Sequence, residues 1–275
     1  MLTNDCAICI RTVDYSETSQ VVTFFSRQTG KVTAIAKGSK RQRSPFGGPV
    51  EMFSYGNIVF SDSGRDKLAT LVEFEPLSGV VDSSFFSADI FVLNCCLFAG
   101  ELVNVLTKDY DPHPGLFDAL LAFLKEASRH KAPEAGPSTP STALGTSSLR
   151  AGQDRMLALL VSFQLSLLRE IGVYPVLDYC VNCRTPFSGR WPEVYFSNKA
   201  NGLICRDCQG AFPDKMAITE EGAKCLGDLH KAKGDIKSLS SADDRTIRQV
   251  ENVLISYITD TLGRPPRMAK YILNT

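Results

Sequence analysis

The feature that most constrains this chain is a pair of Cys-x-x-Cys motifs, Cys180/Cys183 and Cys205/Cys208, with 21 residues between them. In such a motif both sulfurs reach one ion at about 2.3 Å. Proline and glycine residues in the intervening segment favour turns that return the second motif to the first. The spacing therefore predicts a four-cysteine zinc site within residues 180–208.

Disulfides, redox chemistry and catalytic zinc are the other uses of such sulfurs. The nine cysteines are an odd number, and the N-terminal residues lack a secretory signal, so a reducing compartment is expected. A thioredoxin-like site needs a βαβ unit, which the sequence does not indicate. Four thiolates leave zinc no position for water, so the metal is predicted to be structural. Chance pairing of buried cysteines stays open as an alternative.

The other cysteines lie on predicted strands or helices and are expected to be small core residues. They are Cys6, Cys9, Cys95, Cys96 and Cys225.

Composition and missing motifs argue against several functional classes. Lys+Arg 30 balance Asp+Glu 30, so binding of nucleic acid would depend on local clustering of charge. No phosphate-binding loop, nucleophile elbow or zinc-protease motif occurs, which favours a binding protein over an enzyme. The most apolar helical segments, 90–99 and 156–171, are shorter than a membrane span. A cytoplasmic protein without membrane association is expected.

The N-terminal residues have the pattern of a β-domain. Five short segments rich in β-branched and aromatic residues are separated by turn clusters, with no helical period among them. The segments are 6–13, 21–26, 31–37, 52–60 and 67–75. Five such strands suit a small closed barrel, because closure removes exposed edges. We predict an oligonucleotide-binding (OB)-like barrel over residues 1–80.

The pattern becomes helical beyond residue 80. Apolar residues recur at helical spacing in several segments, and Gly263 with Pro265 ends the last one. The segments are 85–106, 116–130, 156–171, 218–231 and a final helix up to residue 262. Residues 131–149, rich in Pro, Ser, Thr and Gly, are predicted to be a disordered loop. The predicted fold class is α+β, with a helical domain over 81–275 that carries the zinc segment.

A run of cations without acidic residues lies on the predicted barrel. Its members are Arg27, Lys31, Lys37, Lys40, Arg41 and Arg43. Strand alternation places Lys31 and Lys37 on one face, and a flexible loop carries the last three. Such a surface would follow a sugar-phosphate backbone without reading sequence. An ordinary solvated face is the alternative, and Phe24, Phe25 and Tyr55 are either stacking platforms or core residues.

A second basic cluster follows the last predicted helix, with Arg264, Arg267 and Lys270. It either extends a DNA-binding surface or stabilises the helix C-terminus, where the dipole favours cations. Both interpretations stay open.

Three stretches of the sequence resemble the bacterial DNA repair protein RecO family. The first, AICIRTVDYSETSQVVTFFSRQTGKVTAIAKGSKRQRS, is similar to the family's N-terminal signature. LREIGVYPVLDYCVNC with YFSNKANGLICRDC is similar to its zinc-bearing segment, and LGRPPRMAKYI to its C-terminal end. The resemblance covers nearly the whole chain in the right order, although the loop after residue 130 is longer than expected for the family.

This resemblance implies an OB barrel, a helical domain and a role in recombinational repair. It implies binding of single- and double-stranded DNA, annealing of complementary strands, and loading of RecA on DNA coated by single-stranded DNA-binding protein (SSB). RecR and the C-terminal tail of SSB are the implied partners, and the nucleoid is the implied location. The family's zinc ligands carry over to Cys180, Cys183, Cys205 and Cys208.

Two other functions stay open from the residues alone. A single-stranded RNA-binding accessory factor would use the same kind of barrel. A zinc-dependent enzyme acting on nucleic acid would need an open coordination position and a general base, and neither is evident.

Overall fold

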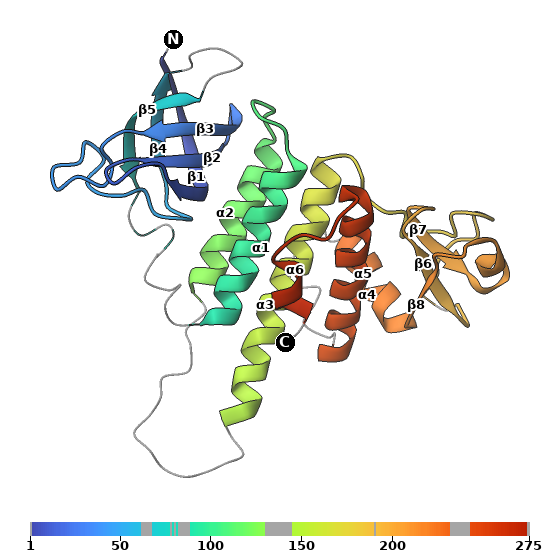
Figure 1. The fold of residues 1–275 in the computed structure, drawn as a ribbon. Coiled ribbons are helices and arrows are strands. Elements are labelled where there is room, and N and C mark those ends of the chain that lie inside the picture. Colours follow the sequence, from blue (N-terminus) through green and yellow to red (C-terminus); the bar gives the residue numbers. More distant parts are fainter. Residues whose placement is uncertain are drawn as a thin grey trace. The chain divides into compact units, whose positions relative to one another are not determined.

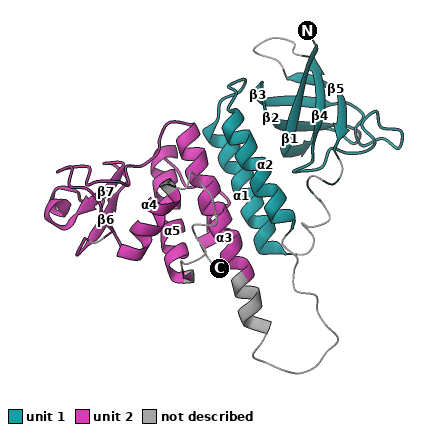
Figure 2. Ribbon diagram, turned by 180° about the vertical axis from the view of Figure 1, so that it is seen from behind, with its two compact units in different colours: residues 1–132 teal, residues 133–275 magenta. Residues whose placement is uncertain are grey.

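A computed structural model describes residues 2–61, 68–77, 79, 81, 89–129, 145–189, 191–231 and 243–273. The chain divides into two compact units, residues 1–132 and 133–275 (Figure 2). Among the described residues no helix is both long and apolar enough to cross a bilayer.

The first unit begins with the predicted barrel. Its strands are β1 (Leu2–Asp14), β2 (Gln20–Ser26), β3 (Gly30–Ala36), β4 (Tyr55–Ser61) and β5 (Ala69–Pro76) (Figure 1). They close in the order β1-β2-β3-β5-β4, with β1 also paired to β4 and a parallel pairing only between β3 and β5. The predicted OB-like barrel followed by helices is confirmed.

Alternation along the strands builds the barrel core. Val22 and Phe24 on β2 face inward with Val32 and Ala34 on β3, and all four side chains are fully buried. The ring of Phe24 lies 5.6 Å from that of Phe74 on β5. Full burial of one such side chain stabilises the fold by about 2 kcal/mol.

The loop between β3 and β4 covers one end of this core. Phe46 and Val50 are buried in it, and the Gln20 side chain bonds both backbone groups of Val50. Ser39 Oγ donates to Gln20 Oε1 at 3.0 Å. The basic segment is a loop, as predicted, and Phe46 anchors it in the core.

Two helices complete the first unit. They are α1 (Ile90–Leu106), capped by the Asp89 carboxylate at the backbone amides of Phe91 and Val92, and α2 (Pro114–Ser128). The ring of Phe117 on α2 lies 6.2 Å from that of Phe25 on the barrel. The compact unit extends to residue 132, because α1 and α2 pack on the barrel. The domain division at residue 80 stays a prediction.

The second unit is built around three helices, α3 (Gly145–Glu170), α4 (Glu220–Lys231) and α5 (Asp244–Leu262), followed by the short α6 (Ala269–Leu273). Helix α5 packs on both α3 and α4 and ends at Gly263, which adopts the left-handed conformation at φ 69°. The predicted disordered loop, residues 131–149, overlaps α3 from residue 145 onward, where no proline interrupts the helix. The remainder of that prediction lies outside the described residues.

A small sheet stands between α3 and α4 in the chain. Its strands β6 (Val194–Ser197), β7 (Gly202–Cys205) and β8 (Met216–Ile218) pair antiparallel in the order β7-β6-β8. A 3-10 helix, Arg206–Ala211, follows β7 directly.

The contact between α3 and α5 contains a buried polar pair. Glu251 is fully enclosed, and the Gln164 side-chain amide donates to both carboxylate oxygens at 2.7 Å. Burial raises the pKa of Glu251 to about 8, since one amide donor does not replace the hydration of a carboxylate.

Candidate metal centre and nucleic-acid interface

The four predicted ligand cysteines come together in the second unit. Their sulfur atoms all lie within 4.8 Å of one another, and Cys183 Sγ is 3.7 Å from Cys205 Sγ. Four sulfurs bound to one tetrahedral zinc at about 2.3 Å would be about 3.8 Å apart. A disulfide would need a separation of about 2.05 Å. The arrangement therefore fits a four-thiolate metal site, and among the described residues it is the one cluster of this kind.

Backbone pairing brings the two motifs together. The Arg184 amide donates to the Cys180 carbonyl at 2.9 Å, which closes a tight turn over the first motif. Beside it, the Leu203 amide on β7 donates to Val176 O, also at 2.9 Å. A β-carbon at Gly202 would lie 2.4 Å from Val176 O, so only glycine permits this approach. The first motif is thus held against the strand that ends at Cys205.

The surroundings favour negative charge on one of the sulfurs and oppose it on two others. Hydrogen bonds from Thr185 lower the pKa of Cys183 to about 6. The pKa of Cys208 is raised, although Asn182 Nδ2 donates to Cys208 Sγ at 3.3 Å. Burial raises the pKa of Cys205 to about 12. Four ionised thiolates therefore need a bound cation, which is the chemistry of a structural zinc site.

The cations predicted on the barrel divide into two groups at opposite ends of β3. Lys31 and Lys37 are six residues apart along an extended strand, about 20 Å. One end, with Arg27 and Lys31, carries α1 and α2 and is called here the helix-covered end. The other, with Lys37, Lys40, Arg41 and Arg43, is called the open end.

At the helix-covered end the cations bind other parts of the protein. Lys31 Nζ donates to the carbonyls of Asn104 and Thr107 at 2.7 and 2.8 Å, and lies 3.3 Å from Asp109. Lys31 therefore provides a hydrogen-bond donor to the last backbone carbonyls of α1, and it is only 9% exposed. Arg27 forms a two-bond pair with Asp118 on α2 at 2.9 and 3.1 Å. This pairing holds the pKa of Asp118 below its usual value.

At the open end most of the cations face solvent. Lys37, Arg41 and Arg43 are exposed, whereas Lys40 Nζ is 2.7 Å from Asp14. The Lys40 amide donates to Thr18 O at 3.1 Å. This bond fixes the basic loop beside the turn between β1 and β2.

Two further residues complement this charge, Tyr15 at the open end and Arg11 near the middle of the strands. Tyr15, in the turn between β1 and β2, is 64% exposed, the exposure that a stacking aromatic needs. Arg11 on β1 is exposed and lies in register with Thr23 and Thr33 on the neighbouring strands. The run of cations in the sequence predicted neither residue, since both lie outside it. An aromatic residue inside a polar turn was the available signal for Tyr15.

The three aromatic residues proposed from sequence lie elsewhere. Phe24 and Phe25 are fully buried, and Tyr55 is partly buried with its ring 6.3 Å from that of Phe117. Their alternative interpretation as core residues describes them correctly.

The second basic cluster follows α5, and its three side chains, Arg264, Arg267 and Lys270, are exposed.

Comparison with known proteins assigns the chain to a family. Residues 1–80 match the model of the recombination protein O N-terminal domain, and residues 147–270 that of the C-terminal domain. A DNA repair protein RecO of Anaeromyxobacter sp. (strain K) is 32% identical over 94% of this chain and 90% of its own length. The chain belongs to the RecO family of DNA repair proteins.

More distant RecO relatives match over similar lengths. The protein of Bacillus pumilus (strain SAFR-032) is 27% identical over 99% of this chain and 94% of its own length. That of Bacillus subtilis (strain 168) is 27% identical over 82% and 76%. The two RecO family models leave α1 and α2 between them, while the C-terminal one includes all four cysteines and the second basic cluster up to Lys270.

Proposed function

We propose that this RecO-family protein binds single- and double-stranded DNA without sequence preference and anneals complementary strands. The observation that supports this most is the open end of the barrel, where exposed Lys37, Arg41 and Arg43 lie on the loop next to exposed Tyr15. Cations attract phosphates, and an aromatic ring stacks on any base. Annealing follows from charge neutralisation, since two strands repel each other less when cations lie between their phosphates.

The proposal assigns the predicted cations different roles. Lys37, Arg41 and Arg43, joined by Arg11 and Tyr15, contact DNA. Lys31 stabilises α1, because its ammonium group already has three acceptors. Arg27 and Lys40 contribute less, since each is paired with a carboxylate.

Family membership suggests the wider setting. We propose that the protein acts with RecR and the C-terminal tail of SSB to load RecA on SSB-coated DNA, without catalysing a covalent step. We further propose that Cys180, Cys183, Cys205 and Cys208 hold zinc, which when bound supplies a closed structural link between the two motifs.

Salt dependence of binding tests the DNA interface. Replacing Lys37, Arg41 and Arg43 with Gln removes three phosphate contacts, so the slope of log K against log salt for single-stranded DNA should fall by about 2. Fluorescence anisotropy from 50 to 200 mM salt measures it, with Lys108→Gln, an exposed lysine before α2, as the control. An unchanged slope in the triple variant would refute the interface.

Metal content tests the zinc assignment. The purified protein should contain about one zinc per chain, and Cys205→Ser should lose it and destabilise the second unit. The single tryptophan, Trp191, is buried near the motifs and reports unfolding of that unit. A Cys225→Ser variant, outside the cluster, should keep the metal. Retention of zinc by Cys205→Ser would exclude the proposed ligand set.

A further inference from the structure

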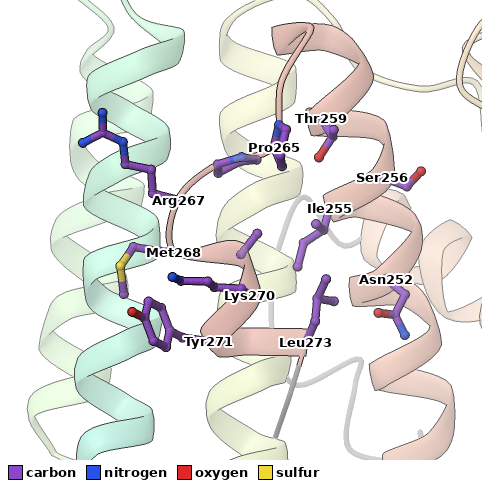
Figure 3. A pocket seen from close by; sticks show the side chains of 12 residues that line it. Asn252, Ile255, Ser256, Thr259, Pro265, Arg267, Met268, Lys270, Tyr271 and Leu273 are labelled. Carbon is purple, nitrogen blue, oxygen red and sulfur yellow. The ribbon is translucent and has the colours of Figure 1, made fainter.

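A groove in the second unit is not used by the proposed barrel interface. It has a volume of about 860 Å³ and lies between α5 and the segment from Pro265 to Leu273 (Figure 3). Helix α5 contributes Asn252, Ser256 and Thr259 along one face, with Ile255 between them. The volume is that of a site for an extended ligand of moderate size.

The segment that forms one wall of this groove carries only positive charge, although the exposed Asp260 lies beside Thr259 on α5. Residues 261–273 contain Arg264, Arg267 and Lys270 but no Asp or Glu. The side chains that α5 supplies to the opposite wall are neutral. A cationic edge over neutral polar and apolar walls favours a ligand that carries both negative charge and flat apolar surface.

An aromatic ring stands beside the cations. Tyr271 is 47% exposed, and Lys270 Nζ lies 4.8 Å from the centre of its ring. Figure 3 shows the two side chains next to each other on the α6 side of the groove. A nucleobase stacks on such a ring while its phosphate pairs with the neighbouring ammonium.

From these features we infer that the groove binds a short segment of single-stranded DNA. Tyr271 stacks with a base, Lys270 pairs with a phosphate, and Asn252 and Thr259 bond polar base edges. The inference rests on the proposed function and extends it, because annealing brings two strands to one protein. The barrel holds one strand and the groove holds the other. An acidic peptide with apolar side chains would also match the charge, but it makes less use of the amide and hydroxyl groups of α5.

Crosslinking on the full-length protein locates the bound strand. Single-stranded DNA containing 5-bromodeoxyuridine should, on irradiation, crosslink to the peptide that contains Tyr271, as found by mass spectrometry after proteolysis. Unlabelled single strands should suppress that crosslink more effectively than duplex. No crosslink within residues 264–273, while crosslinks appear on the barrel, overturns the groove assignment and leaves the barrel interface intact.

Annealing of complementary oligonucleotides tests the function of the groove. Tyr271→Ala should slow annealing about tenfold, since stacking of one base contributes about 1–3 kcal/mol, whereas Tyr271→Phe keeps the ring and should stay within about twofold. Lys270→Gln should lower the salt slope by about 0.7, and Lys224→Gln, an exposed lysine on α4, should not. Normal annealing by Tyr271→Ala overturns the groove. An inert wild-type protein refutes the proposed function itself.

A labelled peptide of aspartate and phenylalanine separates the rival ligand. The proposal is overturned if the peptide binds, Lys270→Gln abolishes that binding, and no DNA crosslink forms. The groove would then be assigned to a protein partner. Competition between single-stranded DNA and the crosslinkable strand, with no effect of the peptide, supports it.

Discussion

The two ends of the barrel hold the same kind of residue and use it differently. At the helix-covered end, Lys31 is buried against the last carbonyls of α1 and Arg27 pairs with α2. At the open end, Lys37 and Arg41 face solvent beside the turn that carries Tyr15. The cations that form one run in the sequence therefore lie at two separate ends of the barrel. What decides between them is whether a helix packs over that end of the strand.

Glycine substitutions give the largest expected contrast between the ends. Gly30 adopts φ 82°, and a β-carbon there would lie 2.3 Å from the backbone oxygen of Asp111. Gly30→Ala should therefore cost about 4 kcal/mol, from left-handed strain and a clash that the backbone must relieve. Gly38→Ala, at φ 72° with only the Arg41 side chain 3.4 Å away, should cost about 1 kcal/mol.

Urea unfolding followed by circular dichroism measures both glycine variants, with Trp191 fluorescence as an internal report on the second unit. Equal destabilisation at the two positions would mean that the helix-covered end is no more tightly packed than the open end.

Lysine substitutions should separate stability from binding. Lys31→Met leaves two carbonyls at the end of α1 without their charged donor and should cost about 3 kcal/mol. Lys37→Met removes no internal bond and should change stability by less than about 0.5 kcal/mol. In DNA binding the order should reverse, with Lys37→Met weaker and folded Lys31→Met close to wild type. Weaker DNA binding by folded Lys31→Met would contradict the division.

The exposed pair between Arg27 and Asp118 should give the smallest effect. Arg27→Gln should destabilise the protein slightly, because both partners are largely solvated. Its pH dependence has a definite sign. The pKa of Asp118 is lowered in the folded state, so the pair contributes above the ordinary carboxyl pKa of 3.8 and the contribution disappears as pH falls through the lowered value. Wild type and Arg27→Gln should therefore converge in stability below about pH 4, and thermal melts at several pH values measure this.

Local patterns predicted much of this protein. Alternating strands and turn residues were enough for a five-stranded barrel, and two short motifs with a fixed spacing placed four cysteines in one cluster. Both depend on residues close in sequence. The roles of Arg27 and Lys31 do not. Their partners lie 73 to 91 residues later, on helices whose packing position no local pattern encodes.

The buried pair of Gln164 and Glu251 has a consequence for how α3 and α5 fit together. Most of the buried side chains of these helices are apolar, and apolar contacts specify one alignment less strictly than a directional hydrogen bond does. A carboxyl group that finds its one donor at a single axial offset penalises every other alignment, as a lone asparagine does in a coiled coil. The pair thereby fixes the axial position of α5 relative to α3. It also fixes where the segment that carries Tyr271 begins.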